Sequence, residues 1–199
     1  MSNERKTEAL VRERLRALSY SEPDNGITIE EQKSEIAKIK SLLSRASKNG
    51  KGNTGYPEFI ISSNKDTTFL IVFECKPDIK KHESPARDKP VEFAVDGVLY
   101  YAKHLAKHYT VVAVAVSGSN ASNMKVSNFL YPVGGGFPKP LVNESGMLVE
   151  EVVPFDDYYR LASFDPEVAK KRHSDLLAFS KELHELIWAK AKISEEDKP

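Results

Sequence analysis

The sequence predicts an α/β domain with a central mixed β-sheet flanked by helices. Two segments, Phe69–Phe73 and Tyr109–Ser117, are almost continuously apolar and rich in β-branched residues, as in strands buried on both faces. An amphipathic helical pattern from Glu92 to His108 separates them, so a right-handed crossover and parallel pairing are expected. The segment Pro57–Ser63 is a further short strand, which the polar residues that follow it fold back against Phe69–Phe73 as a hairpin.

The remaining elements follow from periodicity and turn residues. Helical spacing of apolar residues predicts a first helix over Thr7–Leu18 and a second from about Ile29 to Ala46. The basic segment Lys48–Asn53 then forms a loop that either closes over a phosphate or only connects the two elements. Val126–Pro132 is expected as an edge strand, and Pro166–Ile193 as a C-terminal helix with a broad apolar stripe.

Composition restricts the class of protein. The 199 residues suit one domain and include 29 basic and 29 acidic side chains, and this zero net charge argues against strong non-specific binding of nucleic acid. A single cysteine excludes an internal disulfide and a multi-cysteine metal site. No signal peptide or membrane-spanning run is present, so we expect a cytoplasmic protein without a membrane partner.

The basic residues gather on both sides of the predicted hairpin. They form either a solvated surface or a set of phosphate contacts. Those before the hairpin are Lys38, Lys40, Arg45, Lys48 and Lys51, and those after it are Lys80, Lys81, His82, Arg87 and Lys89.

Three charged residues on the hairpin form a candidate catalytic site. Because strand side chains alternate, Glu74 and Lys76 share one face and lie roughly 7 Å apart along the strand. The hairpin brings Glu58 to the same end of the sheet. Two close carboxylates repel each other unless a cation lies between them. Hard oxygen ligands beside an ammonium group suit Mg²⁺ and the hydrolysis of a phosphodiester.

These residues resemble a known nuclease motif. Pro57-Glu58 is followed, sixteen positions after Glu58, by the triplet Glu74-Cys75-Lys76, which resembles the PD-(D/E)xK nuclease superfamily. Glu58 stands where most members have aspartate. The segments GYPEFII, LIVFECK and AVDGVLYYAKHL more narrowly resemble the N-terminal nuclease domain of type I restriction subunits and fused type IIG restriction-modification proteins.

The resemblance covers about Glu8 to Ser117 and implies a restriction-endonuclease-like core with an added C-terminal helix. It implies a bound Mg²⁺, with Mn²⁺ able to substitute, held by Glu58, Glu74 and Cys75. Lys76 corresponds to the catalytic lysine.

The resemblance also implies an auxiliary acid on the first helix, and Glu8 is the residue that matches it. Glu8 falls beside the apolar stripe that contains Val11 and Leu15, whereas Glu13 points well away. The alternative is that Glu8 only occupies the first turn, which the helix dipole favours.

We therefore expect a Mg²⁺-dependent DNA endonuclease domain of a restriction-modification enzyme, acting on double-stranded DNA. The alternative is a nuclease-like module without activity that binds DNA or serves in assembly. Residues 1–165 form the expected nuclease domain, and residues 166–199 a helical extension or linker. The resemblance implies covalently linked methyltransferase, target-recognition or motor domains that this chain does not contain.

Overall fold

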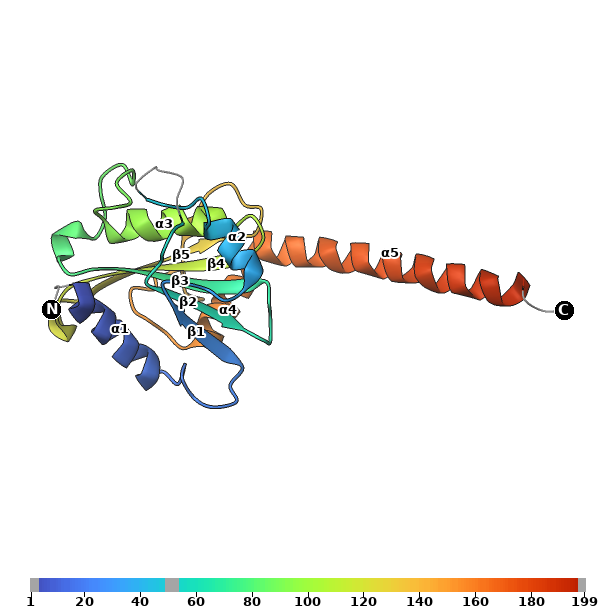
Figure 1. Ribbon diagram of the computed structural model, residues 1–199, viewed down its shortest axis with the longest axis horizontal. Coiled ribbons are helices and arrows are strands. Elements are labelled where there is room, and N and C mark those ends of the chain that lie inside the picture. The colour runs from blue at the N-terminus through green and yellow to red at the C-terminus, as the bar shows by residue number, and fades with distance from the viewer. Residues whose placement is uncertain (1–3, 49–53, 197–199) are drawn as a thin grey trace.

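The computed structural model describes residues 4–48 and 54–196 and shows a three-layer α/β/α domain (Figure 1). One sheet contains six strands in the order β1-β2-β3-β4-β5-β6. Every neighbouring pair is antiparallel except β3 and β4, so the sheet is mixed as predicted. The strands are β1 Ile27–Glu31, β2 Phe59–Ser63, β3 Phe69–Lys76, β4 Thr110–Ser117, β5 Lys125–Tyr131 and β6 Lys139–Pro140.

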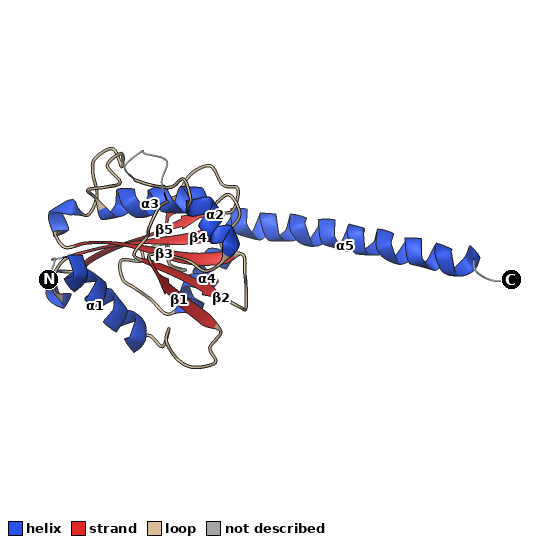
Figure 2. Ribbon diagram, in the orientation of Figure 1, coloured by secondary structure: helices blue, strands red, loops and turns tan. Residues whose placement is uncertain are grey.

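Helices cover both faces of the sheet (Figure 2). Helices α2 and α3 pack on one face, and α1 and α4 pack on the other, each against its own apolar cluster. The helices are α1 Glu4–Ala17, α2 Ala37–Leu43, α3 Ala94–Leu105, α4 Phe155–Ser163 and α5 Pro166–Glu196, with short 3-10 turns at Ile79–Lys81 and Ala121–Asn123.

The central strands pair as the sequence predicts. Strands β3 and β4 are parallel from Phe69 opposite Thr110 to Lys76 opposite Ser117, with α3 as the crossover between them. Strands β2 and β3 form the expected antiparallel hairpin, in which Phe59 lies opposite Phe73. Every residue of β2, β3 and β4 is buried, which explains their nearly continuous apolar sequences.

The alternation of side chains along β3 assigns each residue to one face. Leu70 and Val72 lie in the cluster under α2 and α3, whereas Ile71, Phe73 and Cys75 lie in the cluster under α1 and α4. Glu74 and Lys76 continue the Leu70 face, because they follow Val72 at even spacing. The charged end of β3 is therefore on the α3 side of the sheet.

The prediction of one helix from Ile29 to Ala46 is wrong in its first part. Residues Ile27–Glu31 form β1, which pairs with β2 along its whole length. The alternation of apolar and polar side chains over Ile27, Thr28 and Ile29 suits a strand. Pairing with the buried hairpin outweighs the helical spacing of apolar residues that the prediction used. Only α2 remains helical. Strand β6 and helix α4 were not predicted, and residues 49–53 of the expected basic loop lie outside the described residues.

The predicted C-terminal helix is present as α5 and leaves the body of the domain (Figure 1). Its first turns contact the body, since Val168 is buried and Arg172 pairs with Asp66 at 3.0 Å. Beyond them, apolar side chains are exposed by 46 to 67%: Leu176, Leu177, Phe179, Leu183, Leu186, Ile187 and Trp188. In the part of the chain that is described, no helix combines the length and apolar character that crossing a membrane requires.

Candidate active site

Glu74 is a fully buried carboxylate at the end of β3. Its Oε1 atom accepts a hydrogen bond from Lys48 Nζ at 2.5 Å and forms an ion pair with Lys76 Nζ at 3.1 Å. Its Oε2 atom is also buried and has no hydrogen-bond partner among the described residues. Leaving a buried acceptor without a partner costs about 1 to 3 kcal/mol, more when it is charged, so this oxygen is a candidate ligand for a cation.

The structure brings Glu58 to the same place, as predicted. The Glu58 main-chain N–H donates to the carbonyl of Phe73 at 3.0 Å, and Phe73 is also the register partner of Phe59, the first residue of β2. Glu58 therefore lies just before β2, at the Glu74 end of β3, and its side chain is half-buried. Both carboxylates act on their common neighbour, because after burial their charges are the largest causes that raise the pKa of the Cys75 thiol.

Gly97 in α3 makes room for the Glu74 side chain. A Cβ atom at this position would lie 3.1 Å from both Cγ and Cδ of Glu74 and 2.8 Å from the carbonyl oxygen of Pro90. These distances are too short for ordinary contact, so only glycine allows α3 to approach the strand here. The close packing that the sequence suggested for Gly97 is thus packing against the candidate catalytic carboxylate.

Tyr101 lies one helical turn beyond Gly97 and forms the next wall of the site. The Lys48 ammonium lies 5.0 Å from the centre of the Tyr101 ring, a cation–π distance. Burial and the negative charge of Glu74 raise the pKa of Tyr101, so the phenol stays protonated. Its oxygen accepts a hydrogen bond from the main-chain N–H of Tyr56 at 3.2 Å, which ties the segment before β2 to α3.

Cys75 points away from the carboxylates. Its thiol is fully buried in the apolar cluster under α1 and α4, and burial raises its pKa well above the usual value. The thiol is therefore neutral and on the wrong face to reach a metal beside Glu58 and Glu74. A contribution from Cys75 to a metal site would have to come from its main-chain carbonyl.

The first turn of α1 lies at the same end of β3, on the opposite face from Glu74. The Thr7 hydroxyl donates to the carbonyl of Gly118 at 2.7 Å and anchors this turn beside the ends of β3 and β4. Glu8 follows it and is half-buried, and its charge contributes to the raised pKa of Cys75. Glu13 is exposed. The predicted helical phase is therefore confirmed, whereas the role of Glu8 stays a prediction.

Two buried polar residues hold the segment after Lys76: Asp96, which the sequence analysis did not single out, and His82, which it counted among the basic residues beside the hairpin. The Asp96 carboxylate accepts from the Ser84 N–H at 3.1 Å, from the Ser84 hydroxyl and from the Lys89 N–H at 2.9 Å. Asp96 could have been recognised from the sequence, because it is an acidic residue at a buried position of an amphipathic helix.

His82 anchors the same segment to the sheet. Its Nδ1 lies 2.7 Å from the Ser117 hydroxyl and its Nε2 lies 2.9 Å from the Ser127 hydroxyl. Burial lowers the pKa of His82 to about 4, with a smaller contribution from Lys125, so the ring is neutral near pH 7. Together with Asp96, this contact fixes the chain that leaves the Lys76 end of β3.

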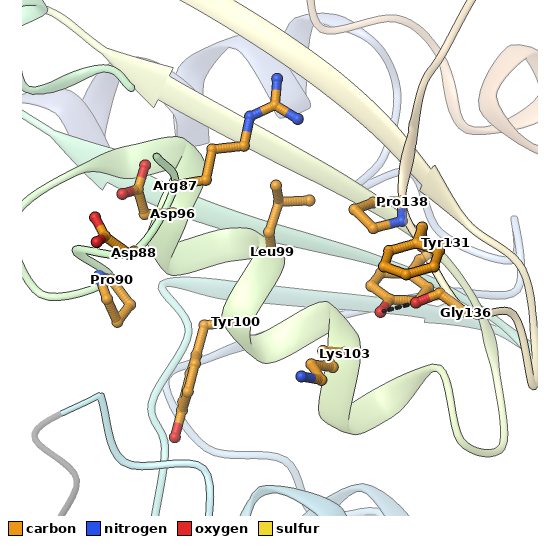
Figure 3. A pocket seen from close by; sticks show the side chains of 11 residues that line it. Arg87, Asp88, Pro90, Asp96, Leu99, Tyr100, Lys103, Tyr131, Gly136 and Pro138 are labelled. Carbon is orange, nitrogen blue, oxygen red and sulfur yellow. Dashed lines mark hydrogen bonds between the residues drawn. The ribbon is translucent and has the colours of Figure 1, made fainter. Parts of the chain in front are cut away.

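A pocket of about 420 Å³ lies on another side of α3. Figure 3 shows its lining, which runs from the segment of Arg87 and Pro90 across α3 to Tyr131 and Pro138. The α3 residues in the lining, Asp96, Leu99, Tyr100 and Lys103, lie roughly 120° around the helix from Gly97 and Tyr101. This pocket is therefore separate from the carboxylates, and it contains both acidic and basic side chains.

The carboxylates suit a hard divalent cation. Among residues 4–48 and 54–196, no three His, Cys, Asp or Glu side chains are close enough to form a metal cluster by themselves. Mg²⁺ needs no such cluster, because it keeps several waters and binds through one or two carboxylates plus phosphate oxygens. The Glu74 oxygen without a partner among the described residues and the carboxylate of Glu58 at the same end of the sheet fit that ligand set.

Sequence comparison relates the chain to a restriction-modification protein. A segment of 108 residues is 33% identical to the type II restriction enzyme and methyltransferase RM.BcgI of Heyndrickxia coagulans. The match covers 48% of this chain and 16% of that protein, so the chain spans only a small part of its relative. No protein-family model matches the sequence, and no solved structure shows significant similarity to it.

Proposed function

We propose that this chain is a Mg²⁺-dependent DNA endonuclease domain of a restriction-modification enzyme, which hydrolyses phosphodiester bonds of double-stranded DNA. The observation that carries the proposal is the state of Glu74. It is completely buried, it shares one oxygen between two lysines, and its other oxygen has no partner among the described residues. A module that only binds DNA has no use for this costly arrangement on a buried strand.

Glu58 and Glu74 would hold the metal ion. When bound, Mg²⁺ supplies positive charge beside the phosphate and lowers the pKa of a water molecule. Mn²⁺ would substitute for it, since it accepts the same oxygen ligands.

Lys76 would act on the reacting groups directly. Lys76 is 9% exposed, and its ammonium is held by Glu74 at 3.1 Å, so its position is fixed before DNA arrives. From there it would orient the attacking water or donate to the phosphate oxygen on which negative charge develops. Preorganised charge of this kind needs no rearrangement during the reaction.

The remaining parts of such an enzyme would come from linked domains. The relative's name combines a restriction enzyme with a methyltransferase, and the aligned segment is 16% of its length. The exposed apolar side chains of α5 offer a surface for such a domain. Methyltransferase, target-recognition or motor domains would then select the sequence, and the present domain would supply cleavage in the cytoplasm.

Cleavage of supercoiled plasmid with Mn²⁺ and excess protein tests the proposal. We expect slow nicking without sequence preference by the unaltered chain, because net charge is zero and affinity for DNA is weak. Lys76→Met should abolish it, whereas the exposed control Lys80→Met should leave it unchanged. Equal nicking by Lys76→Met and the unaltered chain would refute the assignment of Lys76, and tight footprinting of one defined site would refute the dependence on linked domains.

A further inference from the structure

A second pocket lies between the end of β1, the start of α2 and the segment before β2. Its volume is about 300 Å³, a size suited to one phosphate with its sugar. Its lining consists of Gln32, Lys33, Ser34, Lys40, Leu43, Thr54, Gly55 and Tyr56. Among the residues that the structure describes, this lining contains two lysines and no acidic side chain, whereas the pocket of Figure 3 includes Asp88 and Asp96 beside Arg87 and Lys103.

The pocket adjoins the carboxylate site through main-chain contacts. Gln32 donates its N–H to the carbonyl of Glu58 at 3.2 Å. Tyr56 is two positions before Glu58, at most about 7 Å along an extended chain. The Tyr56 N–H is bound to the Tyr101 hydroxyl, whose ring contacts the lysine on Glu74. If a DNA strand placed one phosphate beside Glu58 and Glu74, a neighbouring sugar-phosphate unit of the same strand would therefore lie at this pocket.

The polar groups of the lining are those that hold phosphates. Lysine, serine, threonine, glutamine and tyrosine side chains make most sequence-independent contacts to the DNA backbone. The Lys33 ammonium lies 6.0 Å from the centre of the Tyr56 ring, and its charge also helps to lower the pKa of Glu35. Tyr56 is 46% exposed, so its ring offers an apolar wall and a hydroxyl donor.

Backbone strain at the rim supports a functional role. Gln32 has a φ of +60°, in the left-handed region that residues other than glycine adopt at a cost. This conformation ends β1 abruptly and carries the chain from Gln32 into Lys33 and Ser34, all three of which line the pocket.

We propose that this pocket binds a backbone phosphate of the DNA strand beside the cleavage site. The inference rests on the proposed endonuclease function, since it takes DNA as the ligand. Lys33 supplies the charge, Tyr56 packs against the sugar, and Lys40 supplies a second charge that Glu35 partly neutralises at 2.8 Å. DNA would then cross the β1–α2 side of the domain, and the pocket of Figure 3 would not contact it.

Fluorescence anisotropy with a labelled duplex, without divalent metal and at low ionic strength, tests this pocket. Lys33→Ala should weaken binding at least threefold and reduce the salt slope by about 0.9, the value for one phosphate contact. Glu35→Gln should have the opposite effect, because it frees the Lys40 charge. Lys103→Ala, an exposed lysine in the pocket of Figure 3, is the matched control and should change neither quantity.

The outcomes separate this inference from the proposed cleavage. If Lys33→Ala binds like the unaltered chain, or if Lys103→Ala loses as much affinity, the pocket is not a phosphate site, whatever the cleavage assay shows. If Lys33→Ala and Glu35→Gln shift DNA affinity in opposite directions but no protein nicks plasmid, the result supports phosphate binding by the pocket and refutes the endonuclease function. If the unaltered chain binds no duplex even at low ionic strength, both are refuted.

Discussion

The ammonium of Lys48 lies 2.5 Å from Oε1 of Glu74, closer than the ammonium of Lys76 on the same oxygen. Lys48 belongs to the basic segment before the hairpin, 26 positions from Glu74, and its side chain is 16% exposed. It therefore supplies much of the positive charge that compensates the buried carboxylate.

Lys48→Met should tighten Mn²⁺ binding at least fivefold. The variant removes a positive charge that competes with the metal for Glu74, and a unit charge at about 4 Å is worth about 1 to 4 kcal/mol in a protein. The free energy of unfolding without metal should fall by about 1.5 to 3 kcal/mol, because a charged hydrogen bond is lost. Titration calorimetry measures the affinity, and Lys40→Met, which breaks the exposed pair with Glu35, is the control. Weaker Mn²⁺ binding by Lys48→Met would show that Lys48 supports the metal instead of competing with it.

Gly97→Ala should weaken Mn²⁺ binding and lower stability. Alanine favours a helix by up to about 1 kcal/mol over glycine. Here, however, the new Cβ would meet the Pro90 carbonyl at 2.8 Å and the Glu74 side chain at 3.1 Å, so α3 or Glu74 must shift. Gly136→Ala is the control, since a Cβ there meets no atom within 4 Å. Metal affinity and melting temperature that rise in Gly97→Ala would contradict the described packing.

Glu8→Gln should slow plasmid nicking by about tenfold or more, the usual effect of removing a group that supports a metal site. Glu13→Gln should have no effect, because Glu13 is exposed on another face of α1. Nicking rates with Mn²⁺ under protein excess measure both. Equal rates for the two variants would show that Glu8 does not support the metal site and only occupies the first turn of the helix.

Stability should fall below pH 6.5 in a manner that depends on His82. Burial lowers its pKa to about 4 in the folded protein, against about 6.5 when unfolded, so the unfolded chain binds more protons between these values. When the pH is lowered from 7 to 4, protonation of His82 in the unfolded chain should lower the free energy of unfolding by about 2 to 3 kcal/mol. Urea unfolding of the wild type and His82→Gln measures it. The variant should lose correspondingly less on acidification, and identical pH profiles would show that His82 is not the group responsible.

The sequence predicts much of this site because its elements are local. Phe69–Lys76 carries both the strand pattern and the charged end, and the hairpin turn follows directly from the polar residues before it. Glu58, Glu74 and Lys76 could thus be placed together without knowledge of the rest of the fold. Parallel pairing of β3 and β4 followed from the helix between them.

Contacts between distant segments could not be predicted in the same way. The two carboxylates were expected to repel each other, but Lys48 approaches Glu74 from a loop whose path no local pattern determines. The bonds of His82 to Ser117 and Ser127 and of Asp96 to Ser84 likewise join residues 12 or more positions apart. The last three residues of β1 were included in the predicted helix that begins at Ile29, and only the pairing with β2 shows that they belong to a strand.

The most direct measurement for the central claim is calorimetric titration of Mn²⁺ into the unaltered protein and Glu74→Gln. The account predicts one Mn²⁺ bound per chain by the unaltered protein and none by Glu74→Gln, because glutamine keeps the shape of the side chain but removes the buried charge. Equal Mn²⁺ affinity in the two proteins would contradict the account, since the metal would then bind somewhere other than the end of β3.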